Sequence, residues 1–274
     1  MKRSLVSVHL EQQNLSSLSG MVEVYGQVAA GNLKTVKNDV VNSREFMDGL
    51  RDMFQEIKSA WEKRAIASTV LPHNDQEVVV FVSANLGFYG DIVERTYQQF
   101  ASYLETNTVQ KIVVLGREGK HMVATRLPQH PFDYVDFPDQ TVEEPALKQL
   151  VNDLEQFERI KIFHGKYVST ITQEVVATKL EGETVDVLDY IFEPDTESIV
   201  NLFEGEILSS VVEQALREGQ LSKFAARIMH LGLAMNKIED RSRQVELRRR
   251  RLLQDTFNRK QRTRLVSVRL LKHL

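Results

Sequence analysis

Residues 221–252 read LSKFAARIMHLGLAMNKIEDRSRQVELRRRRL, and their apolar positions follow a heptad pattern. Alternate steps of three and four residues from Leu221 reach a mostly apolar series: Phe224, Ile228, Leu231, Met235, Ile238, Ser242, Val245, Arg249 and Leu252. Apolar residues about 3.5 positions apart form a seam along one side of a helix, and another helix has to cover that seam. Because residues 198–274 contain no proline, the sequence predicts a long C-terminal helix with a helical partner.

The N-terminal part of the chain has a similar pattern. The same alternating steps from Leu15 reach Leu18, Val22, Tyr25, Ala29, Asn32, Val36, Asp39, Ser43, Phe46, Leu50, Met53 and Ile57. All six prolines lie between Pro72 and Pro194. We therefore expect a coiled-coil helix over residues 1–66 that pairs antiparallel with a coiled-coil helix over residues 196–274, along part of its length. A compact α/β domain over residues 76–195 is then inserted between them.

Composition limits the class of protein. The 274 residues are 42% hydrophobic, which is enough for a substantial core, and the net charge of −3 argues against bulk nucleic-acid binding. The absence of cysteine excludes disulfides, thiolate metal sites and thiol nucleophiles, and it suits a reducing compartment. No run of about 18 apolar residues occurs, so we expect no direct membrane insertion and only indirect membrane association, through a partner.

The middle of the chain has the pattern of a Rossmann-like domain. Residues 78–83 and 111–116 are short β-branched runs that are typical of buried strands, and residues 92–105 between them are amphipathic. This order predicts a βαβ unit with parallel strands, in which Asp91 caps the helix. Further predictions are a short helix at 117–127, an edge strand at 132–137, and a helix that starts with a Thr141–Glu144 capping box. Residues 159–164 and 167–178 are expected to pair as antiparallel strands.

The turn at residues 83–90, SANLGFYG, lies where doubly wound sheets bind phosphates, after the first strand and before a helix N-terminus. It lacks the spacing of G-x-G-x-x-G and of G-x-x-x-x-G-K-[ST]. A tight turn with its aromatic side chains in the core is therefore favoured, and nucleotide binding is the alternative. The seven histidines never have the i, i+4 spacing of a helical metal pair, and no group of side chains resembles a catalytic triad. We expect no metal, no cofactor and no catalytic residue.

Residues 241–264 are strongly basic, with nine arginines and one lysine against two carboxylates. A basic helix of this kind is suited to an acidic protein surface through charge complementarity. Nucleic acid is an alternative, but Phe257 is the only aromatic residue available to stack on bases. A merely solvated face is the remaining interpretation.

Several segments, in order, resemble the gamma subunit of F-type ATP synthases. Residues 82–90 are similar to its V-S-x-x-x-G-L-C-G turn, 114–119 to its strand ending in G-x-K-G, 163–170 to V-x-N-K-F-x-x-T, 189–195 to Y-x-x-E-P-D, 222–229 to E-x-A-A-R-M, and 28–34 to V-A-A-x-K-L-R. The resemblance extends over nearly the whole chain.

The resemblance implies a non-catalytic central-stalk rotor, peripheral to the cytoplasmic face of the cell membrane. Its implied partners are the alpha and beta subunits, the epsilon subunit and the c-ring. Ion-driven rotation would couple to ATP synthesis or hydrolysis at nucleotide sites of the partners. The residues that would contact partners are Val28, Ala29, Ala30, Gly87, Phe88, Tyr89, Gly90, Arg227, Arg248, Arg249, Arg250 and Arg251.

Two segments depart from the family pattern. Residues 20–25, GMVEVY, replace the basic K-I-T-K-A-M stretch, and residues 257–262 only echo the family's C-terminal Y-N-x-x-R-Q block. The alternatives are therefore a gamma-like subunit of another rotary ATPase, or a nucleotide- or nucleic-acid-binding α/β protein with a coiled coil.

Overall fold

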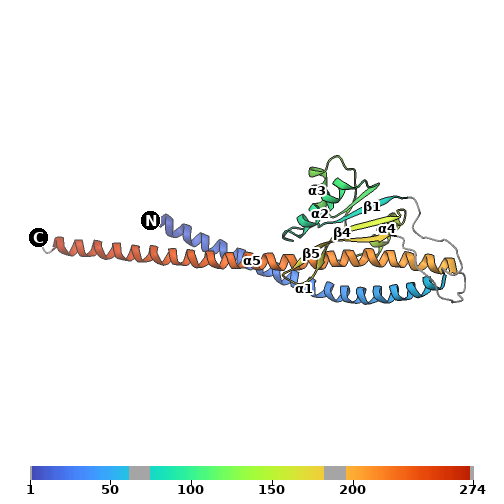
Figure 1. Cartoon of the computed structure of the whole chain (residues 1–274). Coiled ribbons are helices and arrows are strands. Elements are labelled where there is room, and N and C mark those ends of the chain that lie inside the picture. The colour runs from blue at the N-terminus through green and yellow to red at the C-terminus, as the bar shows by residue number, and fades with distance from the viewer. Residues whose placement is uncertain (1, 62–74, 182–195, 272–274) are drawn as a thin grey trace. The chain divides into compact units, whose positions relative to one another are not determined.

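The computed structural model describes residues 2–61, 75–181 and 196–271 (Figure 1). The elements in chain order are α1 (Lys2–Trp61), β1 (Glu77–Val82), α2 (Ile92–Thr106), β2 (Lys111–Leu115), α3 (Arg117–Arg126), β3 (Asp133–Val135), α4 (Glu144–Leu154), β4 (Arg159–Tyr167), β5 (Gln173–Glu181) and α5 (Thr196–Leu271). Two long terminal helices thus flank a small mixed domain.

The chain divides into two compact units, and each contains part of α1 and part of α5. The sheet unit is Ala29–Met229. The helical unit combines the described residues before Ala29 with those after Met229. The expected domain boundaries at residues 66, 76, 195 and 196 stay predictions, and two of them, 66 and 195, lie outside the described residues.

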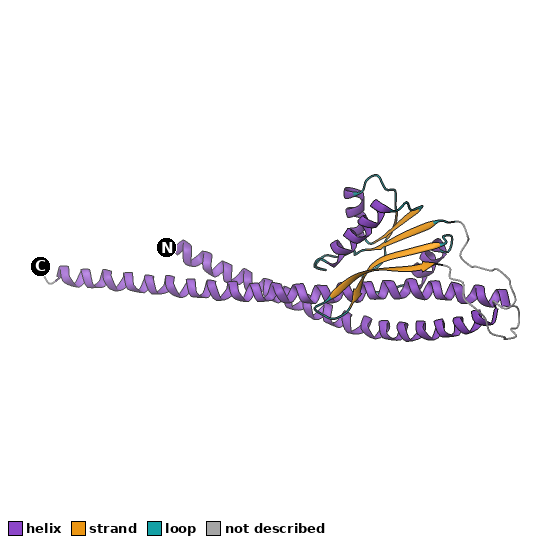
Figure 2. Cartoon of the chain, viewed as in Figure 1, coloured by secondary structure: helices purple, strands orange, loops and turns teal. Residues whose placement is uncertain are grey.

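A five-stranded sheet in the order β3-β2-β1-β4-β5 forms the centre of the sheet unit (Figure 2). β1 pairs parallel with β2 and with β4, β2 pairs parallel with β3, and β5 pairs antiparallel with β4. The predicted βαβ unit, edge strand and antiparallel pair are all present. All six residues of β1 are buried, as its uniformly apolar composition indicated.

Helices cover both faces of the sheet. Successive residues of a strand point to opposite faces, so β1 contributes Val78, Val80 and Val82 to one core and Val79 and Phe81 to the other. The second core is completed by α2 and α3. The first core is completed by α4 and by four residues of α5: Leu208, Val212, Ala215 and Leu216. The last helix is therefore part of the α/β core.

In the sheet unit, α1 packs against α5 through a third apolar cluster. Val36 and Val40 of α1 lie in this cluster with Leu221 and Phe224 of α5. Ion pairs lie at its side, with Arg217–Asp39 at 3.0 Å and Arg44–Glu218 at 2.9 Å. The predicted pairing of the terminal helices is present here.

In the helical unit, α1 and α5 pair antiparallel. Gln12 donates a hydrogen bond to Glu246 at 2.8 Å, and Ser19 donates to the Met235 sulfur at 3.3 Å, so the partner number falls as the position in α1 rises. Val8 of α1 and three residues predicted for the α5 seam are buried: Leu231, Ile238 and Val245. The heptad prediction for α5 is confirmed at these positions, whereas Arg249 of the same series is exposed.

The heptad prediction for α1 is confirmed at seven of the ten positions whose burial is described: Leu15, Val22, Ala29, Asn32, Val36, Asp39 and Ser43. It is wrong at Leu18, Tyr25 and Phe46, which are about half exposed. Beside Leu18 and Tyr25, the partly buried positions lie one residue later, at Ser19 and Gly26. The 3.5-residue repeat fits both series, and small residues at 19 and 26 carry no hydrophobic signal that would choose between them.

Two predicted helix caps are wrong. Asp91 precedes α2, but its backbone is already helical and its side chain makes no capping hydrogen bond. The expected capping box of Thr141 and Glu144 does not form, because α4 begins at Glu144 after an extended Glu143. Pro145 then lies in the first turn, where a missing N–H is tolerated.

Gly165 of β4 tests the contact between the sheet and α5. A Cβ at this position would overlap Ser222 Oγ and lie 3.0 Å from Ile92 Cγ1. We expect Gly165→Ala to lower the free energy of unfolding by about 1–3 kcal/mol, measured by denaturant titration. Gly219→Ala on α5 is the matched control, because its nearest atom would be Val82 Cγ1 at 3.4 Å. Equal unfolding midpoints for the two variants would contradict this packing.

Candidate functional site

The loop between β1 and α2, residues 83–91, is the centre of the candidate site. Its backbone takes left-handed conformations at Phe88 (φ 67°) and Gly90 (φ 62°), which is uncommon for a large side chain. Tyr89 is buried, as predicted for the turn, but Phe88 is 72% exposed. The interpretation that both aromatic rings lie in the core is therefore wrong for Phe88, because the left-handed residue turns its ring outward.

A buried carboxylate organises this loop. Asp139, which follows β3, accepts hydrogen bonds at Oδ2 from the backbone N–H groups of Asn85 (2.8 Å) and Leu86 (2.9 Å) and from the Tyr89 hydroxyl (3.1 Å). Its Oδ1 accepts from Lys223 Nζ of α5 at 2.8 Å. Burial and the nearby Asp139 charge raise the pKa of the Tyr89 hydroxyl, so Tyr89 remains a donor.

Lys223 and Arg227 attach α5 to the same loop. Lys223 Nζ also donates to the Ser83 carbonyl at 2.8 Å. Arg227, one helical turn later, donates to the Gly87 carbonyl, and its guanidinium lies 4.2 Å from the centre of the Tyr89 ring. The structure therefore brings together three residues that the resemblance named, Gly87, Tyr89 and Arg227.

The loop leaves little room for a phosphate at the end of β1. Asn85 Oδ1 accepts a hydrogen bond from the Arg117 N–H at the start of α3, a donor that a bound anion would otherwise use. Gly116 packs directly against the backbone of Ala84, and a Cβ added to Gly116 would lie 2.8 Å from that backbone. Protein groups thus fill the crevice where a doubly wound sheet binds nucleotides, which disfavours the nucleotide-binding alternative.

Sequence reasoning missed Asp139, Lys223 and Asn85. Asp139 comes directly after Pro138, in a segment whose only signal was that of an edge strand. Lys223 stands where the E-x-A-A-R-M block of the resembled family has its glutamate. That charge reversal was the one available signal that a carboxylate partner is required.

The predicted segment at residues 28–30 lies within α1. Ala29 is fully buried, whereas Val28 and Ala30 are exposed. Met21, Val24 and Val28 are each at least half exposed. They form one apolar stripe along α1, because residues spaced three and four apart lie on the same face of a helix. This stripe includes the segment in which the chain departs from the family's basic pattern.

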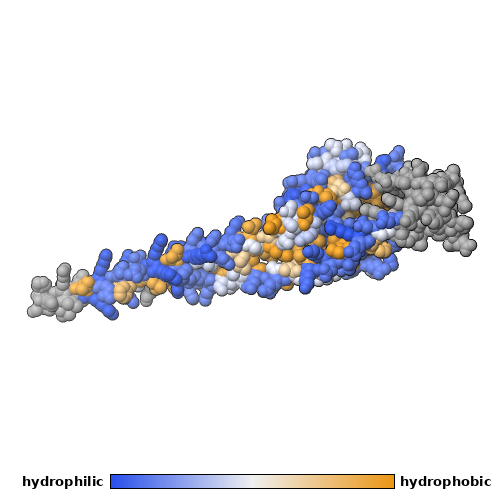
Figure 3. All heavy atoms as spheres, turned by 60° about the horizontal axis from the view of Figure 1, so that its bottom comes forward, coloured by the Kyte–Doolittle hydropathy of each residue, from blue (hydrophilic) through white to orange (hydrophobic). Residues whose placement is uncertain are grey.

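The arginine run lies on the exposed surface of α5 in the helical unit. Arg249 and Arg250 bind Glu246 at 2.9 and 3.1 Å, and these hydrogen bonds hold the pKa of the Glu246 carboxyl at about 2. Arg248 and Arg251 are exposed, and no ion pair joins them to another described residue. In Figure 3 the C-terminal part of α5 is mostly hydrophilic. Two of the four predicted arginines are thus available to an external anion.

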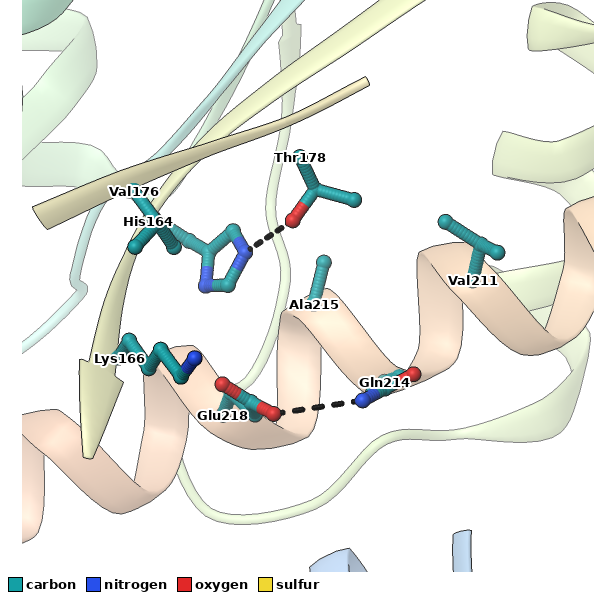
Figure 4. Close-up of a pocket in the computed structure, with 8 residues that line it drawn as sticks. All are labelled: His164, Lys166, Val176, Thr178, Val211, Gln214, Ala215 and Glu218. Atoms are coloured by element: carbon teal, nitrogen blue, oxygen red, sulfur yellow. Dashed lines mark hydrogen bonds between the residues drawn. The ribbon is translucent and has the colours of Figure 1, made fainter. Parts of the chain in front are cut away.

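A cavity of about 200 Å³ lies between the β4–β5 pair and α5 (Figure 4). His164 points into it, with Nδ1 donating to the Gly165 carbonyl at 3.1 Å and Nε2 accepting from Thr178 Oγ1 at 2.8 Å. Glu218 lies on the opposite wall and is paired with Arg44. Burial lowers the pKa of the His164 imidazole below its usual value, so the ring stays neutral near pH 7.

Metal binding and membrane crossing are two further possibilities for the described residues. Within residues 2–61, 75–181 and 196–271, no group of histidine, aspartate and glutamate side chains is arranged to hold a metal ion. None of the helices described there is both long and apolar enough to cross a membrane.

The fold and the loop define a class of protein in which two paired terminal helices carry an α/β domain whose ligand crevice is filled by its own side chains. The sequence model of the family described as ATP synthase matches residues 8–257. The chain belongs to this family, and the curated relatives that it matches include ATP synthase gamma chains.

The relatives are distant but are matched over most of their length. The gamma chain of Wolbachia sp. subsp. Brugia malayi (strain TRS) is 21% identical over 248 residues, which cover 82% of this chain and 85% of the relative. That of Protochlamydia amoebophila (strain UWE25) is 22% identical over 275 residues, covering 92% and 93%.

Two solved structures share the fold. A chain of the Euglena gracilis mitochondrial ATP synthase rotor superposes with a TM-score of 0.66 at 12% identity, over 94% of this chain and all of that one. A chain of the Tetrahymena thermophila ATP synthase central stalk and c-ring gives 0.60 at 18% identity, over 81% and 99%.

The buried His164 predicts a pH dependence of stability. Its imidazole pKa is lowered in the folded chain, so below about pH 6.5, the ordinary histidine value, the unfolded chain binds more protons. We expect the free energy of unfolding to fall as the pH falls from 7.5 to 5.5, by at most about 1.4 kcal/mol per pH unit from this residue. Denaturant titrations should show a shallower pH dependence for His164→Gln. His121→Gln, at an exposed position, is the control, and equal slopes for both variants would refute the assignment.

Proposed function

We propose that this chain is the central-stalk rotor subunit of an F-type ATP synthase. Ion flow through the membrane sector would turn it, and its rotation would drive ATP synthesis at the partner alpha and beta subunits, or run in reverse during hydrolysis. The observation that carries the proposal is the family match over residues 8–257, which takes in both terminal helices and the α/β domain.

The packing of the sheet unit supports a mechanical role. A torque on the α/β domain has to reach the helices, and α5 is itself part of the core on one face of the sheet. Lys223 and Arg227 add hydrogen bonds from α5 to the β1–α2 loop. Close-packed contacts of this kind transmit force with little relative movement. In this role the chain contributes no reacting group, and nucleotide chemistry belongs to the partners.

The surfaces of the two units support different partner contacts. Arg248 and Arg251 of the helical unit suit carboxylates on the inner surface of an alpha and beta ring. The alpha and beta ring is also proposed to contact the exposed residues Phe88, Gly87 and Gly90. The rest of the α/β domain is proposed to bind the epsilon subunit and the c-ring, which would place the chain peripherally on the cytoplasmic face of the cell membrane.

The apolar stripe of Met21, Val24 and Val28 supports a variant of this role. Where the family pattern is basic, this chain presents exposed apolar side chains. The partner surface that faces this stripe would be less acidic than a surface that binds the family's basic segment. Such a difference is expected for a gamma-like subunit of another rotary ATPase.

Co-purification is the direct test of the assignment. A tag on the chain, introduced in its native cells, should recover alpha and beta subunits from solubilised membranes together with ATPase activity. Truncation after Leu247 should abolish that activity, because it removes the four consecutive arginines at residues 248–251. Recovery of the chain alone, beside an intact ATP synthase with a different gamma chain, would refute the proposal.

The two exposed arginines predict a graded electrostatic effect. We expect Arg248→Gln with Arg251→Gln to weaken rotor binding or coupled ATPase activity, and Arg248→Glu with Arg251→Glu to weaken it by about tenfold more, because reversal adds repulsion to lost attraction. Activity of the purified complex at low and high salt measures the effect, which salt should reduce. Equal activity of the parent, glutamine and glutamate forms would contradict an acidic partner surface.

A further inference from the structure

The carboxylate of Asp139 lies in an arrangement that usually holds an external anion. Two consecutive backbone N–H groups, those of Asn85 and Leu86, point at its Oδ2, and the side chains of Tyr89 and Lys223 complete the shell. Successive N–H groups in a turn form a concave anion-binding nest. This nest follows a parallel strand and precedes a helix, which is the position of phosphate loops in doubly wound proteins.

Burial shows that the carboxylate belongs to the structure. The side chains of Asp139 and Lys223 are only 2% and 8% exposed. A charge removed from water to this extent requires a partner of opposite sign and further hydrogen bonds. Asp139 and Lys223 are each other's charge partner, although they are 84 residues apart in the chain, and the loop supplies the further hydrogen bonds.

We propose that Asp139 is an internal ligand of the β1–α2 loop, and that together with Lys223 it locks this loop to α5. The two side chains are positioning residues, because they fix the loop that carries Gly87 and Phe88 and are themselves buried. Lys223 also donates to the Ser83 carbonyl, so the loop cannot leave α5 without breaking this bond as well as the bonds that pass through Asp139.

The lock depends on the opposite charges of Lys223 and Asp139. The motif E-x-A-A-R-M has a glutamate at the position of Lys223. A glutamate here would place a second carboxylate against Asp139, and two like charges in one buried site repel. The lysine and the aspartate therefore form a pair of opposite charges, and a buried lysine at this position requires a carboxylate beside it.

A reporter for the lock can be built into the cysteine-free chain. Ser83 is 2% exposed, and its Oγ has no hydrogen-bond partner among the described residues, so Ser83→Cys is nearly isosteric. The thiol introduced by this change should react with a maleimide only when the loop opens, and all further changes are made in this background. We expect Asp139→Ala to raise the labelling rate of the full-length chain at least about tenfold, because buried donors lose their acceptor.

Formate, a carboxylate of the size that Asp139→Ala removes, is the decisive probe. If the nest is an anion site, sodium formate should slow labelling of Asp139→Ala back toward the parent rate, whereas sodium chloride of equal ionic strength should do less. Adding Lys223→Met should abolish the formate effect. Unchanged labelling in Asp139→Ala, or formate no better than chloride, would overturn the proposal. A formate effect that persists without Lys223 would overturn the role of the lysine.

A second buried carboxylate provides the control. Glu77 is 8% exposed, and its carboxylate binds two side chains, accepting from the Tyr103 hydroxyl at 2.7 Å and pairing with Lys161 at 3.7 Å. Glu77→Ala removes a comparable buried carboxylate without emptying a nest at this loop. Formate should therefore leave labelling of the Ser83→Cys thiol unchanged in Glu77→Ala, and an equal response in both variants would show a general solvent effect and refute the nest.

The effect of the lock on coupling rests on the proposed function, and it is measured separately, as the ratio of ion transport to ATP hydrolysis. In the assembled complex, Asp139→Ala should lower the ratio of ion transport to ATP hydrolysis, and Lys223→Arg, which keeps the charge, should preserve that ratio. An unchanged ratio in a complex that assembles normally would refute the positioning role. Failure to recover any complex would refute the proposed function instead, while the labelling assay still decides whether the lock exists.

Discussion

The burial of α5 against the sheet is the constraint on which the other parts of the sheet unit depend. Leu208, Val212 and Leu216 complete the core on one face of the sheet. Further along the same helix, Leu221 and Phe224 pack against α1. A single helix therefore holds the α/β domain on one side and its partner helix on the other, and neither contact can form properly without it.

The polar contacts around the β1–α2 loop add specificity to this apolar packing. Replacing a buried ion pair by apolar groups is often neutral for stability, whereas removing one partner costs about 3–5 kcal/mol. The pair of Lys223 and Asp139 is thus poor evidence of extra stability. It is better understood as a device that permits only one arrangement of the loop on α5, which is what a part that transmits force requires.

Much of the fold could be predicted from the sequence, because the relevant signals are local. The buried run of β1 and the amphipathic α2 follow from periodicity, and the family resemblance came from short motifs in order. The register of α1 was missed at Leu18 and Tyr25, since a heptad series is ambiguous when neighbouring positions are both compatible with a seam. The partner of Lys223 was missed because Asp139 meets it only in three dimensions. The motif named Arg227 as a partner contact, which stays a prediction, and its bond to Gly87 could be found only in the structure.

Whether the chain turns inside an assembly is tested most directly by single-molecule rotation. Thr108 is exposed in the loop between α2 and β2, so Thr108→Cys provides a unique attachment point in a chain without other cysteines. The complex would be fixed through its beta subunits, and a bead would be attached through the thiol of the Thr108→Cys variant. We expect stepwise rotation in one direction that requires ATP and stops with an ATPase inhibitor. A bead that only fluctuates about one position while the complex hydrolyses ATP would contradict this expectation.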